Sequence, residues 1–166
     1  MTGRYANAGL GRAWFVSSSY IRENEPTNPL TIIDLQDPTQ AEITIGGDEA
    51  YVDYGYSTAL LPNIDGMGNP GIAIGARLAG QATEGIRRGL VKVHRLLFDA
   101  GSWSIEERPW TLVPGEDSVY DSRLGRELRS APYGSSAAGG HVLVMSSPYS
   151  RSLSSGMGTA WALQFP

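Results

Sequence analysis

Gly55–Ala76 reads GYSTALLPNIDGMGNPGIAIGA. Two apolar runs, 55–61 and 71–76, flank a loop that is crowded with Gly, Asn and Asp. Such a loop lets the chain turn sharply and can bring several oxygen atoms together, and short apolar runs between turns are typical of strands. The stretch therefore predicts two neighbouring strands joined by an oxygen-rich loop, the second strand being covered on both faces.

The composition of the whole chain favours many short elements joined by tight turns. Its 166 residues include 21 Gly and 10 Pro, which is high for a helical protein. Apolar residues make up 41% of the chain, enough for one buried core. We therefore expect a single all-β unit over residues 1–166.

Charge and cysteine content exclude several classes of partner and site. Only 18% of the residues are charged and the net charge is −4, so no basic field is available to hold nucleic acid. The chain has no Cys, which excludes disulfides and thiolate chemistry. No run approaches the roughly 20 apolar residues of a membrane span, and the N-terminus lacks the features of a signal peptide. We expect a soluble protein, or a soluble piece of one.

Short apolar or alternating runs, separated by turn residues, recur along the rest of the chain. Ser19–Pro29 is polar and contains Pro, which supplies no donor to a sheet, so this segment is expected to be a loop. Further strands are expected at Gly9–Ser18, Leu30–Leu35, Glu42–Ile45, Gly89–Leu96, Trp103–Glu107, Trp110–Val113, Leu124–Leu128, His141–Met145 and Gly158–Leu163.

The strand pattern repeats with a period of about 70 residues. Gly55 and Gly125 lead similar strands 70 residues apart. Glycine-led strands also begin at Gly11, Gly89 and Gly158, with separations of 78 and 69 residues. Because the order of the intervening features recurs as well, the chain is predicted to contain a true internal repeat.

The residues of the first copy resemble the FG-GAP repeat, the blade unit of the β-propellers of integrin α-subunits. The resemblance implies blades of four antiparallel strands packed face to face around an axis, with a leading strand at 9–18, one blade at 30–96 and a second blade at 103–165. The segments that carry the resemblance are Tyr54–Ser57, Asn63–Gly66, Ile72–Ala76 and Gly89–Val93 in the first copy, and Leu124–Gly125, Val142–Pro148 and Gly158–Trp161 in the second.

About two blades and a leading strand cannot close a ring, because propellers typically have about four to eight blades. The remaining blades are expected from other chains, either from copies of this chain joined head to tail or from another part of a longer propeller. Trp14 and Phe15 lie in the leading strand and Trp161 in its counterpart near the C-terminus, so these residues are expected to complete blades across such contacts. A closed β-sandwich with the tryptophans in its core is the alternative.

The loop between the two apolar runs resembles the calcium loop of the FG-GAP family, which has acidic or amide side chains at its first, third, fifth and ninth positions. These positions are Asn63, Asp65, Met67 and Gly71 in this chain. A thioether suits soft metals and Gly has no side chain, so Asn63, Asp65 and Asn69 remain as a weak, degenerate calcium site. The alternative is that they only form the turn, with Asp65 accepting hydrogen bonds from local backbone amides. No other cofactor is expected.

No arrangement of residues indicates catalysis. The chain has two His residues, too few for a usual zinc site, and its serines lack a nucleophile elbow. We expect a non-enzymatic interaction or assembly protein that associates with further blades and presents loops to a protein or glycan ligand. The alternative is a carbohydrate-binding lectin assembled from two-blade subunits, since tyrosines near turns could stack on sugars. The resemblance implies an extracellular or cell-surface location.

Overall fold

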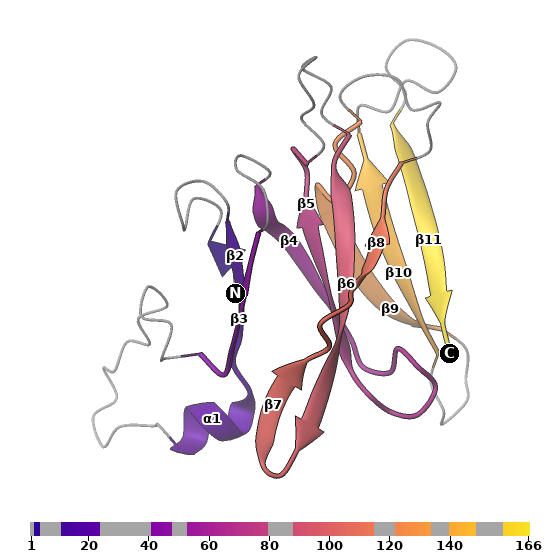
Figure 1. Ribbon diagram of the computed structural model, residues 1–166. Helices are drawn as coiled ribbons and strands as arrows, with labels where there is room; N and C mark the ends of the chain where they lie inside the picture. Colours follow the sequence, from indigo (N-terminus) through magenta and orange to yellow (C-terminus); the bar gives the residue numbers. More distant parts are fainter. Residues whose placement is uncertain are drawn as a thin grey trace.

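The part of the chain that the structure describes forms three antiparallel sheets and one short helix (Figure 1). The computed structural model describes residues 2–3, 11–23, 41–47, 53–79, 88–114, 122–133, 140–148 and 158–166. Among these residues no helix is long and apolar enough to cross a membrane. The expected all-β class is confirmed, while the strand expected at Leu30–Leu35 lies outside the described residues.

The N-terminal sheet contains β1 (Thr2–Gly3), β2 (Arg12–Phe15) and β3 (Ile43–Gly46), in the order β1-β2-β3. β2 and β3 are antiparallel, and Ala13 lies opposite Ile45. Both of these side chains are buried against the next sheet. Of the strand expected at Gly9–Ser18, residues 12–15 are observed as strand and 16–17 are not, while 9 and 10 lie outside the described residues.

Helix α1 (Ser18–Glu23) corrects the expectation that all of Ser19–Pro29 is loop. The carbonyl of Ser17 accepts a hydrogen bond from the amide of Ile21 at 3.1 Å, and the amide of Ser17 donates to the carboxylate of Glu42. Serine is favoured at helix starts, and the first Pro of the segment comes after the helix has ended. The segment can therefore form a short helix before its prolines take effect.

The central sheet contains β4 (Tyr54–Leu61), β5 (Gly71–Ala76), β6 (Leu90–Asp99), β7 (Ser102–Ile105) and β8 (Trp110–Leu112). β4, β5 and β6 follow one another across the sheet. β7 pairs with the second half of β6 and β8 with its first half, both on the edge away from β5. Because Glu106 also donates its amide to the carbonyl of Arg95 at 3.0 Å, β7 and β8 form one interrupted fourth strand.

The C-terminal sheet contains β9 (Glu127–Tyr133), β10 (Gly140–Ser147) and β11 (Thr159–Phe165), in the order β9-β10-β11. It stands beside the central sheet, with β9 next to β4 (Figure 1). β9 begins later than the strand expected at Leu124–Leu128, because Leu124 belongs to the turn that leads into it.

That turn has the same backbone as the turn that leads into β4, 70 residues earlier. The φ angles of Asp53 and Gly55 are 51° and 81°, and those of Arg123 and Gly125 are 54° and 84°. Each turn is closed by a backbone hydrogen bond, of 3.0 Å in the first and 3.2 Å in the second. The sequence spacing between Gly55 and Gly125 therefore corresponds to a repeated local structure.

Each turn also meets a glycine of the preceding sheet in the same way. Tyr54 forms a parallel bridge with Gly11, and Leu124 forms one with Gly89. The two glycines have φ angles of 75° and 72°, and a Cβ atom on either would overlap the backbone of its partner. Glycine recurs at these positions because neighbouring sheets approach each other through backbone there.

The central sheet separates two hydrophobic clusters, which we call the N-side and the C-side cluster. Ile72 and Ile74 of β5 belong to the N-side cluster, shared with the N-terminal sheet, and Ala73 belongs to the C-side cluster, shared with the C-terminal sheet. All six residues of β5 are buried, as predicted for a strand covered on both faces. The three sheets are therefore packed in series rather than as a two-sheet sandwich.

Candidate functional site

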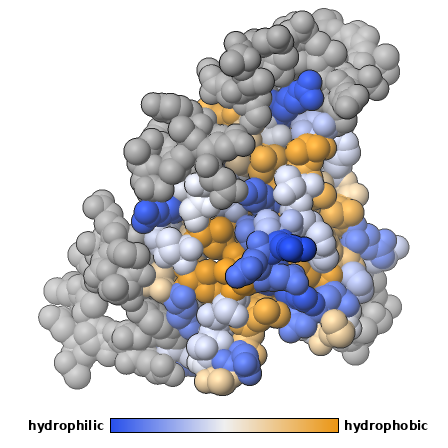
Figure 2. All heavy atoms as spheres, in the orientation of Figure 1, coloured by the Kyte–Doolittle hydropathy of each residue, from blue (hydrophilic) through white to orange (hydrophobic). Residues whose placement is uncertain are grey.

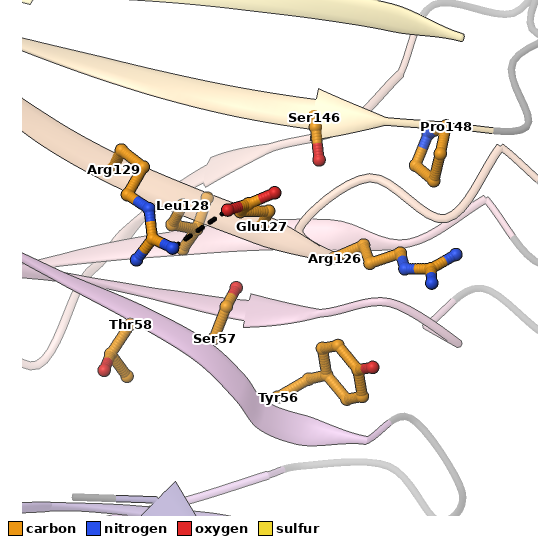
Figure 3. Close-up of a pocket in the computed structure, with 9 residues that line it drawn as sticks. All are labelled: Tyr56, Ser57, Thr58, Arg126, Glu127, Leu128, Arg129, Ser146 and Pro148. Atoms are coloured by element: carbon orange, nitrogen blue, oxygen red, sulfur yellow. Dashed lines mark ion pairs between the residues drawn. The ribbon is translucent and has the colours of Figure 1, made fainter.

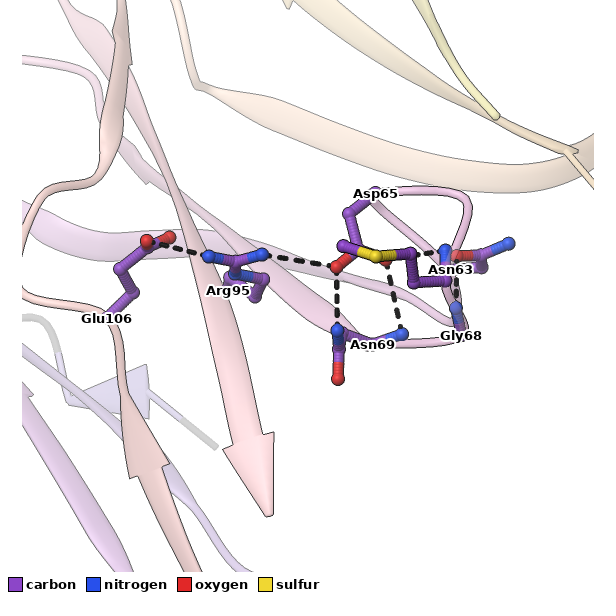
Figure 4. A network of polar contacts seen from close by, with 7 residues as sticks. Asn63, Asp65, Gly68, Asn69, Arg95 and Glu106 are labelled. Atoms are coloured by element: carbon purple, nitrogen blue, oxygen red, sulfur yellow. Dashed lines mark hydrogen bonds and ion pairs between the residues drawn. The ribbon is translucent and has the colours of Figure 1, made fainter. Parts of the chain in front are cut away.

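The loop between β4 and β5 brings Asn63, Asp65 and Asn69 together (Figure 4). One carboxylate oxygen of Asp65 accepts hydrogen bonds from the amides of Met67 at 2.9 Å and Asn69 at 3.4 Å. The other accepts one from Asn69 Nδ2 at 2.6 Å. Asn63 Oδ1 accepts a hydrogen bond from the amide of Gly68 at 2.9 Å. The side-chain oxygens of Asn63 and Asp65 are thus bound to donors of the loop itself.

Arg95 of β6 supplies a positive charge to this loop. Its Nη1 lies 3.2 Å from Asp65 Oδ2, and its Nη2 lies 2.8 Å from Glu106 Oε1 (Figure 4). The Asp65 side chain is only 10% exposed, and Glu106 sits at the interruption between β7 and β8. The guanidinium therefore balances the charge of Asp65 and joins the loop to the far edge of the central sheet.

These contacts hold the pKa of Asp65 at about 2, below its ordinary value of 3.8. The hydrogen bond from the Asn69 side chain is the largest cause, and the amide of Met67 and the side chain of Arg95 act in the same direction against burial. The pKa of Arg95 is raised, mainly by Glu106 and then by Asp65. Asp65 and Arg95 are therefore both charged at neutral pH.

The other two positions of the proposed calcium loop offer no ligand in this arrangement. Met67 is 75% exposed. Gly71 lies beneath Ile64, because a Cβ atom at Gly71 would come within 2.5 Å of Ile64 Cγ2. Within the described ranges no three His, Cys, Asp or Glu residues gather as a metal site. The observed hydrogen bonds are those of the turn-forming alternative, and calcium binding stays a prediction from the resemblance.

A polar pocket of about 650 Å³ opens between β4 and β9 (Figure 3). At its side, Ser57 Oγ donates to the carbonyl of Gly125 at 2.7 Å, and Glu127 pairs with Arg129 at 3.0 Å. Because β4 and β9 begin with the same turn, the pocket lies between corresponding ends of the two strands. It is lined by Tyr56, Ser57, Thr58, Arg126, Glu127, Leu128, Arg129, Ser146 and Pro148.

One face of the Tyr56 ring is already covered at this pocket. The guanidinium of Arg77 lies 4.1 Å from the ring centroid. Arg77 is itself held by Asp53, whose Oδ2 lies 2.7 Å from its Nε. A sugar could therefore not stack on this face of the ring.

The three residues assigned to assembly strands are not brought together. Trp14 is buried in β2, whereas the neighbouring Phe15 contacts Trp103 of β7 with ring centroids 5.3 Å apart. Trp161 lies in β11, half-buried against the C-side cluster. It also lines an apolar pocket of about 390 Å³ between β8 and β11. Trp14 and Trp161 thus hold corresponding positions in their strands but belong to different sheets.

The sequence pattern did not indicate Arg95 as a partner of Asp65. The alternation of β6 marks Arg95 only as a polar position on a strand. Its place becomes clear from the antiparallel register of β5 and β6, which sets Gly71 opposite Arg95 at the end of the loop. Arg95 could therefore have been predicted as a partner of Asp65 from the register of the two strands, but not from the spacing of residues in the sequence.

Protein-family models give no match to this chain, and no curated protein matches it significantly.

Proposed function

We propose that this chain is a non-enzymatic assembly protein, and that its three sheets are blades, or parts of blades, of an FG-GAP-like β-propeller. The observation that carries the proposal is the turn repeated at Asp53–Gly55 and Arg123–Gly125, with the same parallel bridge to the preceding sheet in both copies. A propeller is built in this way, because each blade follows the last through the same rotation.

The pairing of the central sheet also supports a blade. Its strands pair in chain order, and β7 and β8 together complete a fourth antiparallel strand. Four-stranded antiparallel sheets packed face to face are the units of propellers. The partners in this proposal are copies of the chain or another propeller chain, at the cell surface or outside the cell, with loops presented to a ligand.

Light scattering of the purified chain tests the proposal. At micromolar concentration we expect a mass above the 17.8 kDa of one chain, because blades that complete a propeller must associate. A constant mass of one chain over a hundredfold range of concentration, about 1 to 100 µM, would contradict self-assembly.

A carbohydrate is the second candidate ligand. The polar pocket between β4 and β9 favours it, because Ser57, Thr58 and the exposed pair of Glu127 and Arg129 offer hydroxyl and charged groups that can bind sugar hydroxyls. A glycan array probed with labelled protein tests this function. Binding that is lost in Glu127→Gln would support it, and an array without any bound glycan would remove it.

A further inference from the structure

One face of the C-terminal sheet points away from the central sheet, and we call it the outer face. Trp161 and Leu163 of β11 pack against the C-side cluster, so the residues that alternate with them lie on the outer face. Ala160 and Ala162 are accordingly exposed. On the neighbouring strand β10, Val144 is 39% exposed, whereas Leu143 and Met145 are buried in the cluster.

The matching positions of the central sheet are buried. β6 and β11 both follow a landmark glycine, so Val91 and Val93 correspond to Ala160 and Ala162. Val91 is 0% exposed and Val93 is 1% exposed, because the C-terminal sheet covers them. In β2, Ala13 holds the same position after Gly11 and is also 0% exposed, covered by the central sheet.

The strand pairing extends this match to β10. Thr58 lies opposite Ile74, and Leu128 lies opposite Met145, so that Ala73 corresponds to Val144. Ala73 is 0% exposed. At these positions the apolar side chains are therefore buried where a following sheet packs on them. On the outer face the matching side chains are exposed.

The outer face also has the composition of an interface. Its centre is formed by Val144, Ala160 and Ala162. The ion pair between Glu127 and Arg129 lies at the border of the outer face, on the edge strand β9. An apolar centre with a polar rim is the usual anatomy of a surface where proteins associate. On the side of the molecule seen in Figure 2, hydrophobic and hydrophilic residues are interspersed.

We propose that a second copy of this chain packs one of its sheets on the outer face of the C-terminal sheet. This proposal rests on the proposed assembly function and names the surface through which the copies associate. The contact continues a series that the chain already contains twice, from the N-terminal to the central sheet and from the central to the C-terminal sheet. In the first step the covered position is the one that matches Ala160, and in the second step the covered positions are those that match Val144, Ala160 and Ala162. Head-to-tail contacts of this kind form rings when their rotation closes.

Two charge substitutions in the full chain, Val144→Glu and Ala162→Glu, test the surface. Each places a carboxylate at the centre of the contact, and an unpaired buried charge should weaken association by about 100-fold or more. Ser104→Glu is the matched control, because Ser104 is exposed on β7 and belongs to another sheet. In light scattering we expect the wild type and Ser104→Glu to associate and both outer-face variants to have the mass of one chain.

The outcomes separate this inference from the proposed function. Outer-face variants that keep the mass of an associated wild type overturn the assigned surface and leave the assembly function standing, whereas a monomeric wild type overturns both. Circular dichroism shows whether each variant folds. If neither variant folds, hydrogen exchange of the wild type decides: amides of β10 and β11 should gain protection on concentration while those of β7 do not, and no gain overturns the proposal.

Discussion

Asp65 is a residue whose ionisation is set by its surroundings. Its carboxylate receives donors from Asn69, Met67 and Arg95, and each of these contacts favours the ionised form. Because the pKa of about 2 in the folded state lies below the ordinary value of 3.8, this group stabilises the fold above about pH 4. That contribution is lost as the pH falls from about 4 through about 2.

We predict that replacing Arg95 raises the pKa of Asp65. In Arg95→Gln the carboxylate loses a neighbouring positive charge, so its pKa should move from about 2 toward the ordinary value. A carboxyl-carbon NMR titration measures this directly. Lys92→Gln is the matched control, since Lys92 lies on the same strand but places its Nζ 5.8 Å from the ring of Tyr54.

An Asp65 pKa that stays the same in Arg95→Gln would contradict the role given to the guanidinium. The same wild-type sample also tests the cation. A saturable shift of the Asp65 resonance in millimolar calcium would show that the loop binds calcium, whereas an unchanged resonance would favour the turn-forming alternative, in which the Asp65 oxygens already accept protein hydrogen bonds.

At the residue scale, sequence was sufficient for contacts within the loop and insufficient beyond it. Asn63, Asp65 and Asn69 are near in sequence and bounded by two strands, so their proximity follows from the chain itself. Arg95 follows Asp65 by 30 residues, and its contact depends on the pairing of β5 with β6. Spacing alone carries no information about that register.

Among the elements, β5 and the turn before β9 bring the backbones of the central and C-terminal sheets close together. A Cβ atom at Gly75 would overlap the carbonyl oxygen of Gly125 and lie 2.6 Å from Ser57 Oγ. These two obstacles are a backbone carbonyl and a hydroxyl that is itself hydrogen-bonded to that carbonyl. The two sheets can meet here only because Gly75 has no side chain.

We predict that Gly75→Ala destabilises the protein by about 2–3 kcal/mol, because the backbone must move apart to admit the methyl group. Gly46→Ala is the control, since Gly46 also lies in a strand and a Cβ atom there would have no heavy atom within 4 Å. Its effect should stay within about 1 kcal/mol. Urea denaturation followed by tryptophan fluorescence measures both, and equal effects would argue against the close approach.

Strands were predictable where apolar runs lie between turn residues, and the connections were less so. The run that became β4 ends before Pro62, the run that became β5 begins after Pro70, and the run that became β10 ends before Ser147 and Pro148, so turn residues fix these limits approximately. The runs that became β7 and β8 were expected as two separate strands. Their placement on one edge of β6 depends on the interruption around Glu106, where Pro109 cannot donate to a ladder.

At the scale of the whole molecule, the sheets are packed in series, and each later sheet covers the same face of the sheet before it. The period of about 70 residues was readable from the glycine landmarks, because those positions require a positive φ or a close approach of backbone. The sequence does not indicate which face of each sheet is covered by the next one. The residues that correspond to buried Val91 and Val93 are Ala160 and Ala162, which are also apolar but are exposed, because no sheet of the described residues packs over them.

If copies of the chain cover that face, association should raise the stability of the folded state. A partner that binds only folded protein stabilises it by mass action, so Tm should rise with protein concentration, by roughly 2–4 °C for each tenfold increase in a chain of this size. Differential scanning calorimetry at several concentrations measures the dependence. Ala162→Glu should remove it and Ser104→Glu should retain it, whereas a wild-type Tm that is independent of concentration would mean that the outer face stays uncovered in solution.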